Sequence, residues 1–186
     1  MRREGQLPTN PHPGFVFLDC EATGLDPPSH PIEVGLAWCD GISEAHLVRP
    51  ASVWERWKWD PEASAAHHIR REDTLSDGRP VEWMADWLNT ACAGHVVCSD
   101  NPLGDGYWLR ELYRAAERVP RFRLVSAVAL VEAALLDGPV GAAGLRDLKL
   151  RVARHCPVTH RAADDALFWA VVFREAMALR RTVATG

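Results

Sequence analysis

An apolar, aromatic-rich segment near the start of the chain constrains the fold most. It reads Phe15-Val16-Phe17-Leu18-Asp19-Cys20-Glu21 and is followed by Thr23-Gly24. A short apolar run that is rich in aromatic residues and closed by a glycine is typical of a buried strand. We therefore expect a central strand here, with two carboxylates at its end.

Three further segments also predict strands. Residues Pro31–Cys39 alternate apolar side chains, and Glu44–Val48 lies between the turn residues Asp40-Gly41 and Pro50. With the first strand, these two segments predict an antiparallel meander of three strands. The short apolar run His95–Cys98 predicts another buried strand.

Helices are expected from residue 81 onward. Apolar residues recur at helical spacing in Val81–Ala93, and Gly94 is a stop signal. Further helices are predicted over Asp105–Arg118, Leu124–Leu136, Leu145–His155 and Asp164–Arg180. Residues 51–80 are Trp-rich and irregular, with short helical pieces, and so long a connection favours a functional rim.

The chain begins with consecutive strands and continues with strands that alternate with helices. This order indicates an α/β fold with a mixed sheet. The 186 residues suffice for one domain with a substantial core. We assign residues 14–182 to this domain and residues 1–13, which are polar and Pro-rich, to a flexible leader.

The composition excludes several classes of protein. The leader has no apolar core of the kind found in secretory signals, and the longest apolar stretch, Leu124–Leu136, is too short to span a bilayer. The five cysteines are widely spaced without a C-x-x-C pair, which predicts reduced, mostly buried thiols. These features predict a cytoplasmic protein with no membrane partner.

The net charge of -4 gives no basic footprint for sequence-independent binding of nucleic acid. A site built from several carboxylates escapes this objection, because bound divalent cations reverse the local sign and receive a phosphate directly. The net charge therefore neither supports nor excludes a nucleic-acid partner.

Asp19 and Glu21 are the first candidate site residues. Alternate residues of a strand point to the same face, about 6.6 Å apart at about 3.3 Å per residue, so the two carboxylates can share a cation. Thr23-Gly24 marks the strand end, where α/β sheets place their sites. Taken alone, such a pair more often just solvates the end of a strand.

Two further acids are expected on inward faces of helices. Asp105 is in helical register with Trp108 and Leu109, and Asp165 is in register with Phe168 and Trp169. Each could instead be an acid favoured by the helix dipole. Buried carboxylates repel one another and lose hydration, which divalent metal binding relieves, and oxygen ligands favour Mg²⁺ or Mn²⁺ over zinc.

Three motifs in order resemble those of the DEDDh exonuclease family, the DnaQ-like proofreading and ribonuclease T type. Residues 17–25, Phe-Leu-Asp-Cys-Glu-Ala-Thr-Gly-Leu, are similar to the first motif, D-x-E-x-T-G-L. Asn101-Pro102-Leu103-Gly104-Asp105 resembles the second, and His160-Arg161-Ala162-Ala163-Asp164-Asp165 resembles the third. The resemblance covers roughly residues 15–180.

The resemblance implies a ribonuclease H-like mixed five-stranded sheet flanked by helices. It implies a 3′ to 5′ exonuclease that uses two divalent cations, Mg²⁺ or Mn²⁺, and releases nucleoside 5′-monophosphates from single-stranded DNA or RNA ends. Asp19 would bridge both metals, Glu21 and Asp165 would complete the first site, and Asp105 would hold the second. His160 would be the general base.

The motifs also supply the residues that we expect to contact substrate. They are Thr23, Gly24, Leu25, Asn101 and Arg161. Asp164, next to the fourth acid, is expected to face solvent by helical register.

The sequence departs from the family pattern in the second motif. Asp100 and Gly104 stand where the family often has His and Phe. The loss of the aromatic residue puts nucleobase contacts there in doubt, whereas metal binding is unaffected. We interpret Asp100 as a turn residue, with a helper acid as the alternative.

Trp54, Trp57 and Trp59 alternate with Arg56 and Lys58 in the irregular segment. These residues could form a base-stacking platform beside phosphate-binding cations. We favour the simpler interpretation, in which the segment packs onto the sheet.

Two alternatives to an active exonuclease stay open. One is a catalytically silent nucleic-acid-binding or scaffold protein on the same fold, although all four acids and the histidine are present. The other is a hydrolase of short oligonucleotides or small nucleotides. The sequence also leaves open the choice of DNA or RNA, homodimer formation and recruitment by a larger complex.

Overall fold

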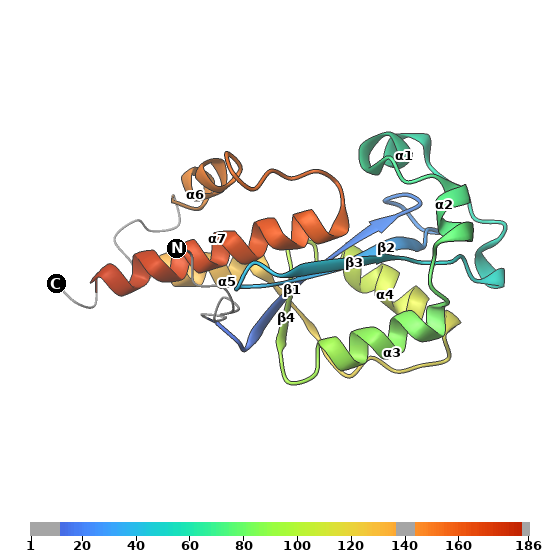
Figure 1. Ribbon diagram of the computed structural model, residues 1–186, viewed down its shortest axis with the longest axis horizontal. Helices are drawn as coiled ribbons and strands as arrows, with labels where there is room; N and C mark the ends of the chain where they lie inside the picture. The colour runs from blue at the N-terminus through green and yellow to red at the C-terminus, as the bar shows by residue number, and fades with distance from the viewer. Residues whose placement is uncertain (1–11, 137–143, 184–186) are drawn as a thin grey trace, which may run out of the picture.

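The computed structural model describes residues 12–136 and 144–183, with side chains described to residue 180. Of the leader expected at residues 1–13, only residues 12 and 13 lie within these ranges. The described residues are arranged around one sheet (Figure 1).

The sheet has five strands in the order β3-β2-β1-β4-β5. The strands are β1 (Phe15–Ala22), β2 (Pro31–Trp38), β3 (Ser43–Leu47), β4 (Val96–Ser99) and β5 (Leu124–Ser126). The first three pair antiparallel, as the predicted meander requires, while β4 pairs parallel with β1 and β5 parallel with β4. The predicted mixed five-stranded sheet is thereby confirmed.

The prediction of one helix over Leu124–Leu136 was wrong at its start. Leu124–Ser126 forms β5, and the helix α5 begins at Ala127 and ends at Leu136. Apart from Ser126 and Glu132 the stretch is apolar, so it shows no period that separates a three-residue strand from the helix after it. Pairing of Val97 with Leu124, which no local pattern reveals, decides the outcome.

The other predicted helices are confirmed, with ends that differ by a few residues. They are α3 (Val81–Ala91), α4 (Gly104–Ala115), α6 (Gly144–Val152) and α7 (Ala162–Val183). The Trp-rich segment contains the short pieces expected of it: a 3-10 turn (Ser52–Trp54), α1 (Pro61–His67) and α2 (Arg71–Ser76).

Helices cover both faces of the sheet. In Figure 1, α5, α6 and α7 lie on one face, α3 and α4 lie on the other, and α1 and α2 lie at one end. Val16 and Leu18 of β1 pack in the core with α3 and α4, whereas Phe17 packs with α5 and α7. Because strand side chains alternate, Asp19 and Glu21 point to the same face as Phe17.

Gly35 of β2 allows the start of α7 to approach the sheet closely. A Cβ atom at this position would lie 2.2 Å from the carbonyl carbon of Ala162, far inside contact distance. Since the clash is with backbone atoms, a side chain here would displace the helix. The glycine thus places the first turn of α7, which carries Asp165, beside β1 and β2.

All five cysteines are free, and four of them are buried. Within residues 12–136 and 144–183, none of the helices combines the length and the apolar character needed to cross a membrane.

Candidate active site

The four predicted acids and the predicted base meet in one cavity of about 450 Å³. Asp19 and Glu21 come from the end of β1, Asp105 from the first turn of α4 and Asp165 from the first turn of α7. The residues that line the cavity are Asp19, Cys20, Glu21, Ala22, Gly24, Leu25, Asp60, Glu62, Ala63, Ala66, His67, Asp100, Asn101, Asp105, Trp108, Val158, His160 and Asp165.

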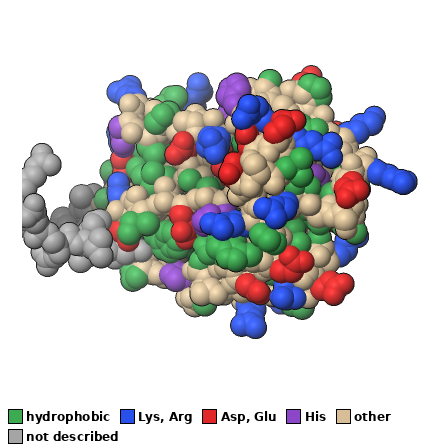
Figure 2. All heavy atoms as spheres, turned by 45° about the vertical axis from the view of Figure 1, so that its right-hand side comes forward, with side chains coloured by type: hydrophobic (Ala, Val, Ile, Leu, Met, Phe, Trp, Pro, Cys, Tyr) green, Lys and Arg blue, Asp and Glu red, His purple; other side chains and the backbone are tan. Residues whose placement is uncertain are grey.

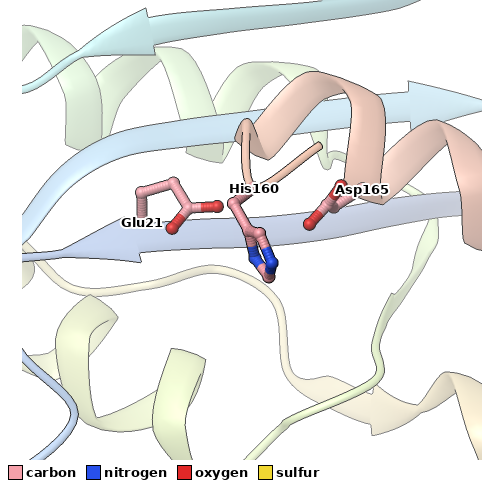
Figure 3. A group of neighbouring side chains, drawn as sticks. All are labelled: Glu21, His160 and Asp165. Atoms are coloured by element: carbon pink, nitrogen blue, oxygen red, sulfur yellow. The ribbon is translucent and has the colours of Figure 1, made fainter. Parts of the chain in front are cut away.

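The ligand atoms of the cavity form two groups. Glu21, His160 and Asp165 make up one group, and within it the possible ligand atoms lie within 4.8 Å of one another. Figure 3 shows the imidazole ring of His160 between the two carboxylates. Asp19, Asp100 and Asp105 make up a second group with the same spacing. Glu21 and Asp165 thus share one group and Asp19 and Asp105 the other, whereas the expected bridging of both metal sites by Asp19 stays a prediction.

Burial makes these carboxylates hard to ionise together. Asp105 is 1% exposed, and burial, with repulsion from Asp100, raises its pKa to about 7 although hydrogen bonds from Ser99 and Cys20 oppose the shift. Burial, followed by repulsion from Asp165 and Glu33, raises the pKa of Glu21 to about 7.

Burial also raises the pKa of Asp165, and it raises that of Asp19 well above its usual range, with neighbouring carboxylates adding to the shift. No Lys or Arg is among the described residues that line the cavity. The cluster therefore favours either protonation or a bound cation.

The donor set fits hard divalent cations. Both groups consist of carboxylate oxygens, apart from the one imidazole, and none of the five cysteines is among these ligand atoms. Oxygen ligands of this type favour Mg²⁺ or Mn²⁺. The mutual repulsion of the carboxylates would be relieved by positive charge at the same place.

The end of β4 fixes the orientation of Asp105. The Ser99 hydroxyl donates a hydrogen bond to the Asp105 carboxylate and accepts one from the backbone N–H of Asn101 at 3.0 Å. The side-chain oxygen of Asn101 accepts from the N–H of Gly104 at 3.2 Å. A Cβ atom at Gly104 would lie 2.4 Å from Nδ2 of Asn101. The glycine that replaces the family's aromatic residue thus lets Asn101 fold back over the turn.

His160 and Asp165 are held at the start of α7. His160 has a positive φ of 56°, and the backbone N–H of Thr159 donates to Asp165 Oδ1 at 2.9 Å. Asp164 is exposed and accepts a hydrogen bond from the Thr159 hydroxyl at 2.7 Å. The helical register predicted this difference between the two neighbouring acids.

Arg161 lies against Glu33 of β2. Its Nε donates to Glu33 Oε2 at 3.1 Å, and the same oxygen accepts from the backbone N–H of Ala162 at 2.9 Å. Glu33 is only 4% exposed in its side chain, whereas half of the Arg161 side chain is exposed. The guanidinium that we expected at substrate thus has an intramolecular carboxylate partner, and a contact with phosphate stays a prediction.

The three remaining expected contact residues differ in their surroundings. Thr23 is fully buried, and its hydroxyl accepts from the backbone N–H of His30 at 3.1 Å. Gly24 lines the cavity, and Leu25 is 79% exposed at its rim. Thr23 therefore shapes the loop, Gly24 is buried in the cavity wall, and Leu25 is accessible.

Sequence reasoning undervalued Asp100 and missed Ser99, Glu33 and His67. Ser99 is the last residue of the parallel strand β4, and Asp100 follows it. This position at the end of a parallel strand could have suggested a site. Glu33 has no such local signal, because its partner Arg161 is distant in sequence. His67 was not assigned a role, although it lines the cavity. His67 is buried, and its Nδ1 accepts from the N–H of Ile69 at 2.9 Å.

Comparisons with known proteins agree with this arrangement. The family model described as Exonuclease (RNase T) matches residues 16–173. No curated protein sequence matches the chain.

Among solved structures, the chain is similar to three of exonuclease I, of which two are complexes of the Escherichia coli protein with DNA. The zinc-bound complex with single-stranded DNA has a TM-score of 0.67 at 16% identity, over 91% of this chain and 41% of that one. The complex with a dT13 oligonucleotide has a TM-score of 0.69 at 13% identity, over 92% of this chain and 42% of that one. A further exonuclease I structure, described as suggesting how processivity is achieved, has a TM-score of 0.66 at 16% identity, over 92% of this chain and 43% of that one.

The chain thus spans about two fifths of the length of these proteins. At this low identity the likeness concerns the fold alone, and it confirms the predicted ribonuclease H-like architecture.

Proposed function

This chain belongs to the DnaQ-like exonuclease family, and from that premise we propose that it is a metal-dependent 3′ to 5′ exonuclease. Its substrate would be a single-stranded DNA or RNA end, and its product a nucleoside 5′-monophosphate. The observation that carries the proposal is the convergence of Asp19, Glu21, Asp105 and Asp165 with His160 in one cavity.

Two groups of residues would hold the cations. Glu21 and Asp165 would hold one Mg²⁺ or Mn²⁺, and Asp19 and Asp105 the other, with Asp100 as an added ligand or a charge in the second group. When bound, such ions neutralise the scissile phosphate and stabilise the attacking and leaving oxygens. The raised pKa values of Glu21 and Asp105 support this assignment, because no Lys or Arg is among the described residues that line the cavity and the charge of Arg161 offsets only part of the rise at Glu21.

His160 is suited to take the proton. Its ring lies beside Glu21 and Asp165, and it is exposed, so a proton accepted from the attacking water can pass on to solvent. The water oxygen forms a bond to phosphorus while the bond from phosphorus to the 3′ oxygen breaks. The remaining strand keeps a 3′-hydroxyl and is one nucleotide shorter.

The size of the cavity favours a single terminal nucleotide. A volume of about 450 Å³ lies in the lower part of the range of ligand pockets. Leu25, exposed at the rim, and residues of α1 line this cavity, where a separated strand end would enter. The 3′ to 5′ direction itself rests on the resemblance to the family.

The test is digestion of 5′-labelled single-stranded 20-mers of DNA and RNA with Mg²⁺ or Mn²⁺. We expect a ladder that shortens one nucleotide at a time from the unlabelled end, with nucleoside 5′-monophosphates as products. Blocking the 3′ end with an inverted nucleotide should stop digestion.

Release of the labelled terminal nucleotide first, or internal cuts on the blocked strand, would contradict the direction. Cleavage of dinucleotides alone would favour the hydrolase of short oligonucleotides. No cleavage with either cation would favour the silent nucleic-acid-binding protein.

A further inference from the structure

A second cavity adjoins the acidic one. Its volume is about 600 Å³, and Gly24 and Asp60 line both cavities. The residues around it are Thr23, Gly24, Asp26, Pro27, Pro28, Ser29, Arg56, Trp57, Lys58, Trp59, Asp60 and Pro61. One wall is thus the Arg-Trp-Lys-Trp stretch, whose role the sequence left open.

Trp54 anchors this wall in the core. It is buried, and its ring stacks on His30 at 4.7 Å with an interplanar angle of 7°. Packing, the interpretation that we favoured for the segment, therefore holds for Trp54. Burial lowers the pKa of His30 to about 4, so a neutral ring lies under Trp54 at neutral pH.

Trp57 and Trp59 are placed differently. Both are half-buried and line the second cavity. Trp57 contacts Trp54 and His30 with ring centroids 6.1 and 6.2 Å apart, and Trp59 meets His30 edge-on at 6.3 Å. The core thus holds both indoles from one side and leaves part of each at the cavity.

Arg56 and Lys58 add positive charge to the same wall. Both are exposed, and the ion pairs found among the described residues involve neither of them. Two acids also line the cavity. Asp60 is engaged in capping α1, where its Oδ1 accepts from the N–H of Glu62 at 2.8 Å, and Asp26 is exposed on the opposite wall.

The opposite wall is tied to the helix that carries Asp105. The indole N–H of Trp108 donates to the Ser29 hydroxyl at 2.9 Å, and the backbone N–H of Ser29 donates to the Tyr107 hydroxyl at 3.4 Å. Tyr107 and Trp108 follow Asp105 in α4. The second cavity is therefore held in a fixed position relative to the acids.

A nucleic-acid strand needs positive contacts that the acidic cavity lacks. Seven carboxylates and no Lys or Arg are among its described lining residues. Figure 2 shows acidic and basic side chains interspersed over the face that includes the end with α1 and α2, without a broad basic surface. Phosphate contacts must then be local, and Arg56 and Lys58 lie in the cavity that adjoins the acids.

We propose that the second cavity binds a further nucleotide of the same single strand. Its base would stack on Trp57 or Trp59, and its phosphate would contact Arg56 and Lys58. The inference rests on the proposed function, because it takes the end of the strand to lie in the acidic cavity. Stacking on indoles tolerates any base, so the subsite is indifferent to sequence.

The test measures binding rather than turnover. Fluorescence anisotropy with 5′-fluorescein-labelled dT10 and a 5′-fluorescein-labelled thymidine mononucleotide is recorded with Mg²⁺ in a His160→Ala background, which slows hydrolysis. The variants are Arg56→Glu/Lys58→Glu, Trp57→Ala and Trp57→Phe. The matched control is Arg146→Glu/Arg154→Glu, which changes the net charge equally at exposed positions in and just after α6. In Figure 1, α6 lies far from α1 and α2.

We expect Arg56→Glu/Lys58→Glu to weaken dT10 binding at least tenfold. Loss of one or two phosphate contacts should also lower the slope of log affinity against log salt by about 0.7 to 1.4. Trp57→Ala should weaken dT10 binding by roughly 5- to 150-fold, the cost of one lost stack. Trp57→Phe should restore most of it, and the mononucleotide, which fills the acidic cavity alone, should show a much smaller loss than dT10.

Equal dT10 affinities of the charge-reversal variant and its control would overturn the subsite. Equal losses for the mononucleotide and dT10 would also overturn it, because they would indicate a general electrostatic effect. If the unmodified protein degrades dT10 while the affinities are equal, the subsite fails and the proposed function stands. If it degrades nothing although the length-dependent loss is seen, the proposed function fails and the strand-binding cavity stands.

Discussion

Arg161 and Glu33 form an ion pair across 128 positions of sequence, with Nε of the arginine 3.1 Å from Oε2 of the glutamate. Glu33 lies directly opposite Glu21 in the pairing of β1 with β2. The pair therefore holds the start of α7 on the sheet, next to a proposed metal ligand. The positive charge of Arg161 also opposes the rise in the pKa of Glu21.

Removing the guanidinium should destabilise the protein. Arg161→Ala would leave the buried Glu33 carboxylate with only the Ala162 N–H, at a cost of about 1.5 to 3 kcal/mol. For a chain of this size the melting temperature should fall by roughly 3 to 12 °C. Arg161→Lys should recover part of the loss, and Arg154→Ala, at an exposed position, should melt like the unmodified protein. An unchanged melting temperature for Arg161→Ala would refute this role.

Gly35→Ala should destabilise the protein more than the addition of a single methyl group suggests. The added methyl group would meet backbone atoms of Ala162 at 2.2 Å, so the start of α7 must move. We expect a loss of about 1 to 3 kcal/mol in the free energy of unfolding, measured by urea denaturation, together with reduced nuclease activity. Gly14→Ala is the control, because a Cβ atom there meets nothing within 4 Å. Equal stabilities of the two variants would show that the close approach is unimportant.

The acidic cluster should make stability depend on pH and metal together. The folded protein raises the pKa of Glu21 and Asp105 to about 7, whereas in the unfolded chain such groups titrate near 4. The folded state then binds more protons than the unfolded state. The contribution of these two groups to the free energy of unfolding is therefore full below about pH 4 and is lost as the pH rises through about 7. Without metal, the melting temperature should fall between pH 5 and pH 8.

Mg²⁺ or Mn²⁺ should reverse that fall. At pH 8 either cation should raise the melting temperature by several degrees above that in EDTA, and at pH 5 the effect should be small because protons compete. Asp105→Asn should flatten the metal-free pH dependence, whereas Asp147→Asn, on the exposed surface of α6, should leave it unchanged. A metal effect of the same size at both pH values would contradict the account.

The proposed role of His160 as a general base can be tested separately from a role as a metal ligand. His160→Ala should lower kcat by about 100- to 10,000-fold, the usual range for loss of a general base. The rise in melting temperature with Mg²⁺ at pH 8 should persist, because Glu21 and Asp165 remain. His155→Ala, at an exposed position beside Glu175, is the control. Loss of the metal-induced rise would instead make His160 a ligand.

Much of the site could be predicted because its signals are local. The position of Asp19 and Glu21 on a strand, and the helical register of Asp105 and Asp165, each follow from spacing along one element. The same register separated Asp165 from the exposed Asp164.

Features that depend on distant partners could not be predicted. The strand Leu124–Ser126 exists because it pairs with β4, although its apolar sequence continues without a break into α5. In the sequence Asp100 resembles a turn residue, and only the packing of α4 and β1 brings Asp105 and Asp19 next to it. The bond from Arg161 to Glu33 joins segments that no pattern along the chain connects.

The most direct test of the central claim compares two neighbouring acids. Asp165 lines the acidic cavity, and Asp164, one residue earlier in α7, is exposed. Nucleotide release from a 5′-labelled single-stranded 20-mer with Mg²⁺ is measured for Asp165→Asn and Asp164→Asn. Because loss of a metal ligand removes several kcal/mol of transition-state stabilisation, Asp165→Asn should be slower by at least about 1000-fold. Asp164→Asn should stay within about threefold of the unmodified rate, and equal rates for the two variants would contradict the proposed active site.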